Sequence, residues 1–368
     1  MKSNILTRRL TAVFLAAALI FAGINGMRLG GEPAYGAAKE TATVYVTMSV
    51  KGDIATKDDR VMAEIPVRVE SEEGMTTIDA VMEAFHKIYK PDGYACDQFV
   101  SKLWGIETSS TLFFINDKSI TSGVKAEPVK SGDRVVAAVT ADDHYYSDYF
   151  TYFEDKVKTG VTGGRIALSL KGYMGMTQNA KSEAIKDAEL GIVTKDGFRK
   201  LEDVTTDEKG NAVIILDKET FSPGQTYFIS AKGTVPATAT DWSSEGNPAV
   251  SVDAPLIAPI CKVTVDSKTT YGVKNTKISA LKVKAVKGKF VLTWKKSDGY
   301  KVDNYQVFRS AKKNGAYKKV STVKEKKCSD KDGLKKGSRY YYKVRGCRSI
   351  DGKPVYTQWS EKVGVKAK

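Results

Sequence analysis

Residues 334–345 read Leu334-Lys335-Lys336-Gly337-Ser338-Arg339-Tyr340-Tyr341-Tyr342-Lys343-Val344-Arg345. After the turn residues, every second position of this stretch carries a large ring or a branched side chain. Successive side chains of a β-strand point to opposite faces. We therefore expect Tyr340, Tyr342 and Val344 to point into a core. The basic residues of the run and just after it are expected on the outer face: Lys343, Arg345 and Arg348.

The sequence around this strand carries more strand patterns. Phe290 to Trp294 ends in a tryptophan suited to a sandwich core, and Tyr305 to Arg309 forms a second apolar run. The stretch from Leu334 onward resembles the conserved corner of the fibronectin type III family. That resemblance covers residues 276–368 and implies a β-sandwich. It also implies that the Tyr340 hydroxyl bonds back to the backbone of the preceding loop.

Charge is distributed unevenly along the chain. Residues 276–368 hold 27 lysines and arginines against 7 acidic residues, whereas residues 39–275 have a net charge of −8. A surface with such an excess of cations attracts polyanions. The alternative is that the lysines only keep the surface soluble. Candidate polyanion-binding residues are those of the corner and its strand: Lys335, Lys336, Lys343, Arg345 and Arg348.

The first 38 residues have the order of a signal peptide. Lys2, Arg8 and Arg9 precede an apolar run of about fifteen residues, and small residues follow up to Ala38. We expect cleavage near Ala38, with a membrane anchor as the alternative, although a spanning helix needs about 20 apolar residues. After cleavage we expect no integral membrane segment. The prediction is a secreted, extracellular or cell-wall associated protein of a Gram-positive bacterium.

Residues 39–153 are expected to form an α+β domain. Thr41 to Val50 and Val61 to Val69 alternate like half-buried strands. Thr76 to Asp79 then reads as a capping box, and the apolar residues that follow it recur at helical spacing up to Tyr89. His86 lies on the opposite face of this helix, where we expect it to be solvated. Three more strand patterns follow, ending near Thr140.

Three motifs of this region resemble those of the transcobalamin-like C-terminal β-grasp family. They are the helix entry Glu73 to Val81, the hairpin Leu112 to Ser119 and the closing segment Val129 to Val135. The sequence departs from the family at Leu112, where tryptophan is common, and at Asp117, where glycine is usual. The resemblance implies a β-grasp fold and capture of a corrinoid or another flat ligand.

Six aromatic residues occur within Tyr145 to Phe153. One interpretation is a plug between domains, since large rings bury much area. The other is a groove in which rings stack on a sugar or a flat ligand while Asn116 supplies a directional hydrogen bond. The candidate ligand-binding residues under the second interpretation are Trp104, Phe113, Phe114, Asn116, Tyr145 and Tyr146.

Residues 154–270 contain short strand patterns separated by turn signals. The runs around Thr205 to Ile214 and Gln225 to Ala231 resemble bacterial Ig-like repeats. The predicted fold class is therefore mainly β and multidomain: an N-terminal α+β β-grasp domain, then two β-sandwiches, Ig-like and fibronectin type III.

No catalytic motif or phosphate loop stands out, and the chain has only two histidines. The stretch Asp142 to Asp148 reads as a polar turn rather than a metal site. Cys328 and Cys347 are the nearest cysteine pair, and both a bridge and free thiols remain open. We expect no enzyme activity, no catalytic residues, no metal and no cofactor.

These observations predict a binding or adhesion protein. The expected partners are anionic cell-wall polymers or surface ligands of the host or of bacteria, with no specific nucleic acid. Capture of a small molecule or glycan by the first domain, and a role as an accessory to a cell-wall hydrolase, are the alternatives.

Overall fold

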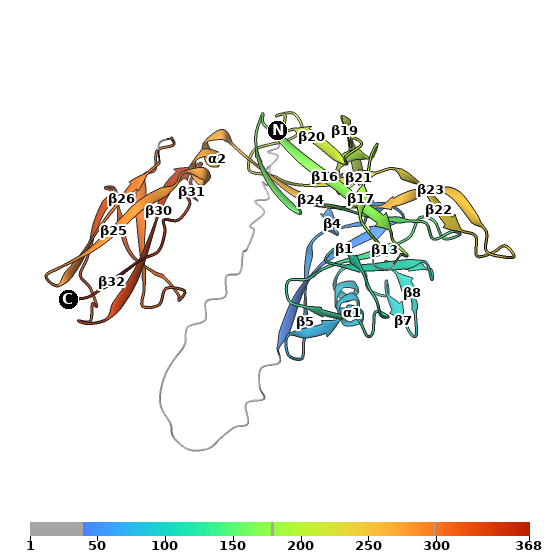
Figure 1. The fold of residues 1–368 in the computed structure, drawn as a ribbon, viewed down its shortest axis with the longest axis horizontal. Coiled ribbons are helices and arrows are strands. Elements are labelled where there is room, and N and C mark those ends of the chain that lie inside the picture. Colours follow the sequence, from blue (N-terminus) through green and yellow to red (C-terminus); the bar gives the residue numbers. More distant parts are fainter. Residues whose placement is uncertain (1–39, 178–179, 298) are drawn as a thin grey trace, which may run out of the picture. The chain divides into compact units, whose positions relative to one another are not determined.

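The computed structural model describes residues 40–177, 180–297 and 299–368, so the expected signal peptide lies outside the described residues. Strands dominate this part of the chain, and they form several sheets (Figure 1). The sheets enclose separate apolar cores. The expected mainly β class is confirmed at this level.

The first domain combines a main mixed sheet with one helix that lies against it (Figure 1). The sheet order is β11-β10-β13-β1-β2, with β5 on the other side of β1. β1 pairs in parallel with β13 and antiparallel with β5. Three small sheets, β3-β4, β6-β12 and β7-β8-β9, complete the domain. The elements are β1 Thr41–Val50, β2 Asp53–Ile54, β3 Thr56–Lys57, β4 Arg60–Val61, β5 Ile65–Glu70, β6 Met75–Thr77, α1 Ile78–Tyr89, β7 Ala95–Cys96, β8 Val100–Leu103, β9 Ile106–Glu107, β10 Thr111–Ile115, β11 Lys118–Ser119, β12 Pro128–Lys130 and β13 Arg134–Val139.

The helix begins one residue later than the capping box from Thr76 to Asp79 predicts. Thr77 is the N-cap, and its hydroxyl accepts a hydrogen bond from the Ala80 amide at 3.3 Å. Asp79 does not reach back to the cap as the capping-box pattern predicts. Its carboxylate instead accepts a hydrogen bond of 2.7 Å from the Tyr94 hydroxyl. This bond links the first turn of α1 to the segment that follows the helix.

His86 is buried, and the expectation of a solvated histidine is wrong. Its side chain is 2% exposed because the segment ending at Trp104 folds back over that face of α1. The Trp104 amide donates to Nε2 at 3.3 Å, so Nε2 carries no proton. Nδ1 therefore donates to the Met82 carbonyl oxygen, 2.8 Å away. The imidazole is held in its neutral form, and burial lowers its pKa.

The second domain is a β-sandwich with one shared apolar core. One sheet has the order β17-β16-β14-β23-β22 with β20 on β16, and the other has the order β15-β24-β21-β18-β19. β14 belongs to this sandwich, although the predicted first domain extends to residue 153. The elements are β14 Tyr149–Phe153, β15 Val157–Val161, β16 Arg165–Met174, β17 Glu183–Ala184, β18 Glu189–Thr194, β19 Gly197–Thr205, β20 Asn211–Ile215, β21 Thr226–Lys232, β22 Thr234–Thr240, β23 Ala249–Ile257 and β24 Cys261–Asp266. The short helix α2, Lys268–Asn275, follows.

The third domain is also a two-sheet sandwich, drawn in orange and red in Figure 1. Its sheets have the orders β25-β26-β29 and β28-β27-β30-β31, and β32 also pairs with β30. The elements are β25 Ile278–Val286, β26 Lys289–Lys296, β27 Asn304–Ser310, β28 Lys318–Val323, β29 Lys327–Asp330, β30 Arg339–Ile350, β31 Lys353–Tyr356 and β32 Val363–Lys366.

The core of the third domain confirms the predicted alternation. Tyr340, Tyr342 and Val344 of β30 are buried, as is Trp294 of β26. The Tyr340 hydroxyl accepts a hydrogen bond from the Lys335 amide at 2.9 Å and donates to the Gly333 carbonyl at 3.4 Å. The predicted bond from this tyrosine to the preceding loop is therefore present.

Cys328 and Cys347 are both buried and both free. Cys328 lies on β29 in one sheet, and Cys347 lies on β30 in the other. The disulfide alternative for this pair is wrong.

The corner tyrosine provides a test of the third domain. Tyr340→Phe should lower the free energy of unfolding by about 1 kcal/mol, because it leaves the Lys335 amide and the Gly333 carbonyl without their partner. Urea denaturation measures the difference. Tyr341→Phe removes a hydroxyl from the neighbouring, half-buried ring and serves as the control. Equal stability of the two variants would contradict the structural role of the corner.

His86 should make the first domain sensitive to acid. The pKa of His86 is lowered from the ordinary value of 6.5, so the unfolded chain binds this proton before the folded chain does. The contribution of His86 to stability is complete above the unfolded pKa and is lost as the pH falls below it, by at most about 1.4 kcal/mol per pH unit. Denaturation of His86→Gln between about pH 5.5 and pH 7.5 should therefore show a shallower pH dependence than the native chain. His144→Gln, which changes an exposed histidine, should keep the native slope.

Candidate functional site

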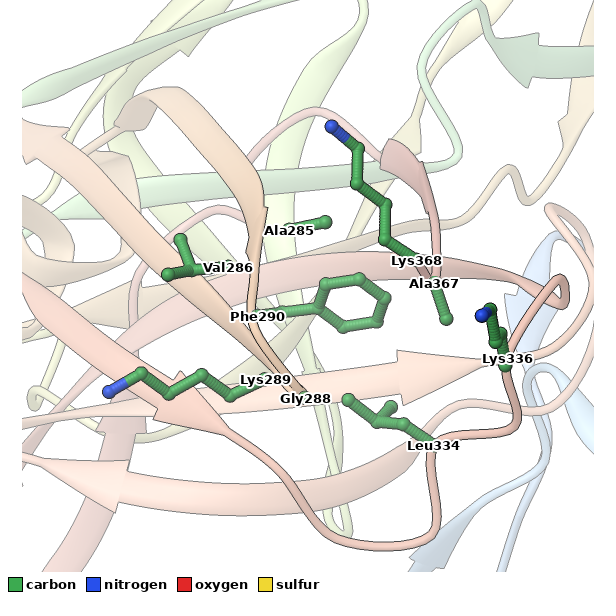
Figure 2. Close-up of a pocket in the computed structure, with 9 residues that line it drawn as sticks. All are labelled: Ala285, Val286, Gly288, Lys289, Phe290, Leu334, Lys336, Ala367 and Lys368. Atoms are coloured by element: carbon green, nitrogen blue, oxygen red, sulfur yellow. The ribbon is translucent and has the colours of Figure 1, made fainter.

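The end of the third-domain sandwich has a cavity surrounded by lysines. Its volume is about 230 Å³. The turn between β25 and β26 contributes Gly288, whose φ of +70° lies in the left-handed region where glycine is favoured. Figure 2 shows the Phe290 ring at the centre of the lining, with lysine side chains around it. The lining residues are Ala285, Val286, Gly288, Lys289, Phe290, Leu334, Lys336, Ala367 and Lys368.

Three of these residues are cationic, and none is acidic. Lys289, Lys336 and Lys368 are exposed, whereas Phe290 and Ala367 are buried and form an apolar floor. A cavity with an apolar floor and a positive rim suits an anion that carries some apolar surface. Of these three lysines the sequence analysis names only Lys336. Lys336 lies in the loop before β30, Lys289 begins β26 and Lys368 follows β32, so no short motif includes all three.

The backbone of the loop before β30 is bonded to a core residue, while the side chains of Lys335 and Lys336 are exposed. The Lys335 amide is the donor to Tyr340, so the core tyrosine fixes the backbone beside Lys336. The Lys335 and Lys336 side chains are both exposed. Lys335 does not line the cavity.

The other three predicted cationic residues lie farther along β30. Lys343 and Arg345 alternate with buried residues and are half-buried rather than fully exposed, because aromatic rings cover them. Arg348 is half-buried and lies opposite Val355 in the ladder with β31. The residues in contact with Lys343 and Arg345 share no member with the cavity lining, so the structure divides the predicted cations into two groups.

The predicted aromatic groove is not assembled. Trp104 and Phe113 lie in the core of the first domain, where Trp104 packs against Phe85. Asn116 turns toward its own sheet: its Nδ2 donates to the Asp133 carboxylate, and its Oδ1 accepts from the Arg134 amide. Burial leaves the two rings little surface for a ligand.

Phe114 lies apart from Trp104 and Phe113, in a cluster that we call the aromatic seam. The seam joins the first and second domains, and its buried members are Phe114, Ala138, Phe150, Tyr173 and Ile257. The Phe114 and Phe150 rings are stacked with centroids 3.8 Å apart. The Tyr173 hydroxyl donates to the Asp117 carbonyl at 3.1 Å, and Lys156 pairs with the Asp117 carboxylate at 2.7 Å. Phe150 and Tyr152 of the aromatic run thus pack between domains, as the plug interpretation predicts, whereas Tyr149 and Phe153 lie in the core of the second domain.

Tyr145 and Tyr146 remain outside this seam in a polar turn, where both are half-buried. The Asp142 carboxylate accepts hydrogen bonds from the amides of His144 and Tyr145 at 3.1 and 2.9 Å. Within residues 40–177, 180–297 and 299–368, no group of three histidine, cysteine or acidic side chains converges to hold a metal ion. None of the helices in the described part is both long enough and apolar enough to cross a membrane.

No protein-family model and no curated protein matches the chain. Among solved structures, the chain is similar to an Fn3-like protein from Clostridium thermocellum, with 24% identity and a TM-score of 0.22 over 26% of this chain and 95% of that one. It is also similar to a segment of two fibronectin type III domains from chicken tenascin, with 13% identity and a TM-score of 0.25 over 59% of this chain and 97% of that one. Pectate lyase PelI from Erwinia chrysanthemi matches with 17% identity and a TM-score of 0.19, over 25% of this chain and 27% of that one. At these TM-scores the similarities carry no argument about what the chain does.

The aromatic seam predicts coupled unfolding of the first two domains. Phe150→Ala should lower the free energy of unfolding by about 3–5 kcal/mol, because it removes a fully buried ring and leaves a cavity. Calorimetry should then resolve two transitions for residues 40–266. Phe99→Ala changes a ring that is 75% exposed and should leave the native trace unaltered. A Phe150→Ala trace identical to the control would show that the seam does not couple the domains.

Proposed function

We propose that this chain is a secreted or wall-associated, non-catalytic binding protein of a Gram-positive bacterium. Its third domain binds anionic cell-wall polymers, and the chain is retained on the wall by this contact. The excess of unpaired lysine and arginine in that domain is the observation that carries the proposal.

Ion pairs neutralise little of this excess in the described part of the third domain. In the described part of residues 276–368, the structure has one salt bridge, between Arg309 and Asp330. The sequence of this region has 27 basic and 7 acidic residues, so most of its cations have no carboxylate to neutralise them. Such a surface favours polyphosphate and polycarboxylate chains over neutral ones. At the lysine-rimmed cavity, a polyanionic polymer would contact individual lysines in addition to being attracted by the overall positive charge of the domain.

For the first domain we propose the β-grasp fold and kinship with the transcobalamin-like family. The central parallel pair of β1 and β13, the hairpin pairing of β1 with β5 and the single helix on the sheet support this proposal. Capture of a corrinoid-like ligand receives no support, since Trp104, Phe113 and Phe114 are buried in cores. We propose presentation or adhesion as the role of the first two domains.

Retention on the wall should depend on the cavity lysines. The triple variant Lys289→Gln, Lys336→Gln and Lys368→Gln should bind purified teichoic-acid-bearing walls at least about threefold more weakly, at roughly 0.2–1 kcal/mol per exposed pair lost. Cosedimentation at rising salt concentration measures this, and screening should weaken the native chain too.

The matched control replaces three exposed lysines outside the third domain: Lys118→Gln, Lys209→Gln and Lys218→Gln. It has the same net charge as the cavity variant and should bind like the native chain. If both variants bind equally, or if salt has no effect on retention, the proposed function is wrong.

A further inference from the structure

Two cations of β30 lie among four aromatic rings and a third cation that other segments contribute. We call this group the cation–aromatic cluster, and its members are Phe308, Tyr317, Lys343, Arg345, Tyr356, Trp359 and Lys362. Lys343 Nζ lies 3.9 Å from the centroid of the Trp359 ring and 4.8 Å from that of Tyr317. Arg345 Cζ lies 3.5 Å from the Tyr356 centroid. The cations and rings therefore alternate across one face of the sheet.

Like charges are gathered in this cluster without a counter-charge. Lys343, Arg345 and Lys362 form no salt bridge in the structure of residues 299–368. Lys362 donates to the Asn314 side-chain carbonyl at 3.1 Å, and Arg345 donates to the Gln306 side-chain carbonyl at 3.0 Å, both of which are neutral. Burial lowers the pKa of Lys343, and repulsion from Lys362 and Arg345 lowers it further.

The rings stabilise these cations without neutralising them, because a ring attracts a cation only through its quadrupole. The positive charge of the cluster therefore remains available to an anion. A bound carboxylate or phosphate would also relieve the repulsion among the three cations, so the site gains more from an anion than isolated lysines do.

The partly exposed Trp359 ring adds an apolar surface to the cations of the proposed ligand site. Trp359 is 39% exposed, and the Phe308 ring meets it edge-on with centroids 5.0 Å apart, which holds the indole in place. Lys343 and Arg345 lie over the same ring, so only the part of the indole that they leave uncovered offers a flat apolar surface, at little conformational cost. A sugar ring has an apolar face of similar size, and an acidic substituent at its edge would reach the neighbouring cations.

We propose that the cation–aromatic cluster is a binding subsite for an anionic sugar residue, which stacks on the uncovered part of Trp359 while its acidic group meets Lys343 and Arg345, the two cations nearest that ring. This inference rests on the proposed function and narrows it, from attraction of polyanions in general to recognition of a sugar that carries the charge. The acidic group is a uronate carboxylate or a phosphate ester, and both share this chemistry.

The test is a titration of the full chain with three probes: a glucuronate oligosaccharide, a sugar phosphate and a neutral glucose oligosaccharide of matched length. Isothermal calorimetry should detect saturable binding of at least one acidic probe and none of the neutral probe. Part of the binding should persist at about 0.5 M salt, since stacking is not screened as exposed charges are.

Variants of Trp359 separate stacking from charge. Trp359→Ala should weaken binding of the acidic sugar at least about tenfold, as loss of an anchoring indole commonly does. Trp359→Tyr keeps a ring and should restore most of the affinity, which excludes misfolding as the cause. Trp242→Ala, which removes a tryptophan that is 64% exposed in the second domain, should have no effect.

The outcomes also separate this inference from the proposed function. If Trp359→Ala binds acidic sugars like the native chain, or if inorganic phosphate competes as well as the sugar does, the subsite is wrong while salt-sensitive wall retention stands. If the neutral sugar binds equally, the charge recognition is wrong. If no probe binds saturably, the subsite is also wrong, and the retention measurement alone decides the proposed function.

Discussion

The alternation of side chains along β30 is the constraint on which the third domain depends. Tyr340, Tyr342 and Val344 must enter the core, so Lys343 and Arg345 must leave it. The same strand thus closes the sandwich and spaces the cations of its outer face. The buried face of β30 also contacts a charged group, the Asp330 carboxylate. The Tyr342 hydroxyl donates to it at 2.6 Å, and Arg309 pairs with it. A buried carboxylate is tolerated because both partners are present.

Local patterns made part of this fold predictable. The helical spacing from Ile78, the threonine cap and the tyrosine of the corner each depend on residues close in sequence, and each appears in the structure. His86 shows a feature that local sequence patterns do not predict. Its helix face is polar in sequence, yet a segment some eighteen residues later covers it and supplies an amide to its ring. Helical periodicity cannot report a cover that comes from elsewhere in the chain.

In the candidate sites, too, some features follow from local sequence and others depend on segments far apart in the chain. Composition alone indicates a cationic third domain. The cavity, however, needs lysines from three separate segments of the chain, and the cation–aromatic cluster needs Tyr317 and Trp359 beside β30. The predicted aromatic groove of the first domain does not form, for a simple geometric reason. Phe113 and Phe114 are neighbours on one strand, so their rings point to opposite faces, one into the domain core and one into the aromatic seam. Two such rings cannot wall one groove.

The parallel pairing of β1 with β13 bears on how the first domain would respond to tension. Six consecutive residue pairs join the two strands, from Tyr45 and Arg134 to Val50 and Val139. Because the strands run the same way, the start of β1 and the end of β13 lie at opposite ends of the ladder. A pull on those two points would load all the rungs at once, in shear, instead of opening them one after another. A domain built in this way is suited to holding its shape when its two ends are pulled apart.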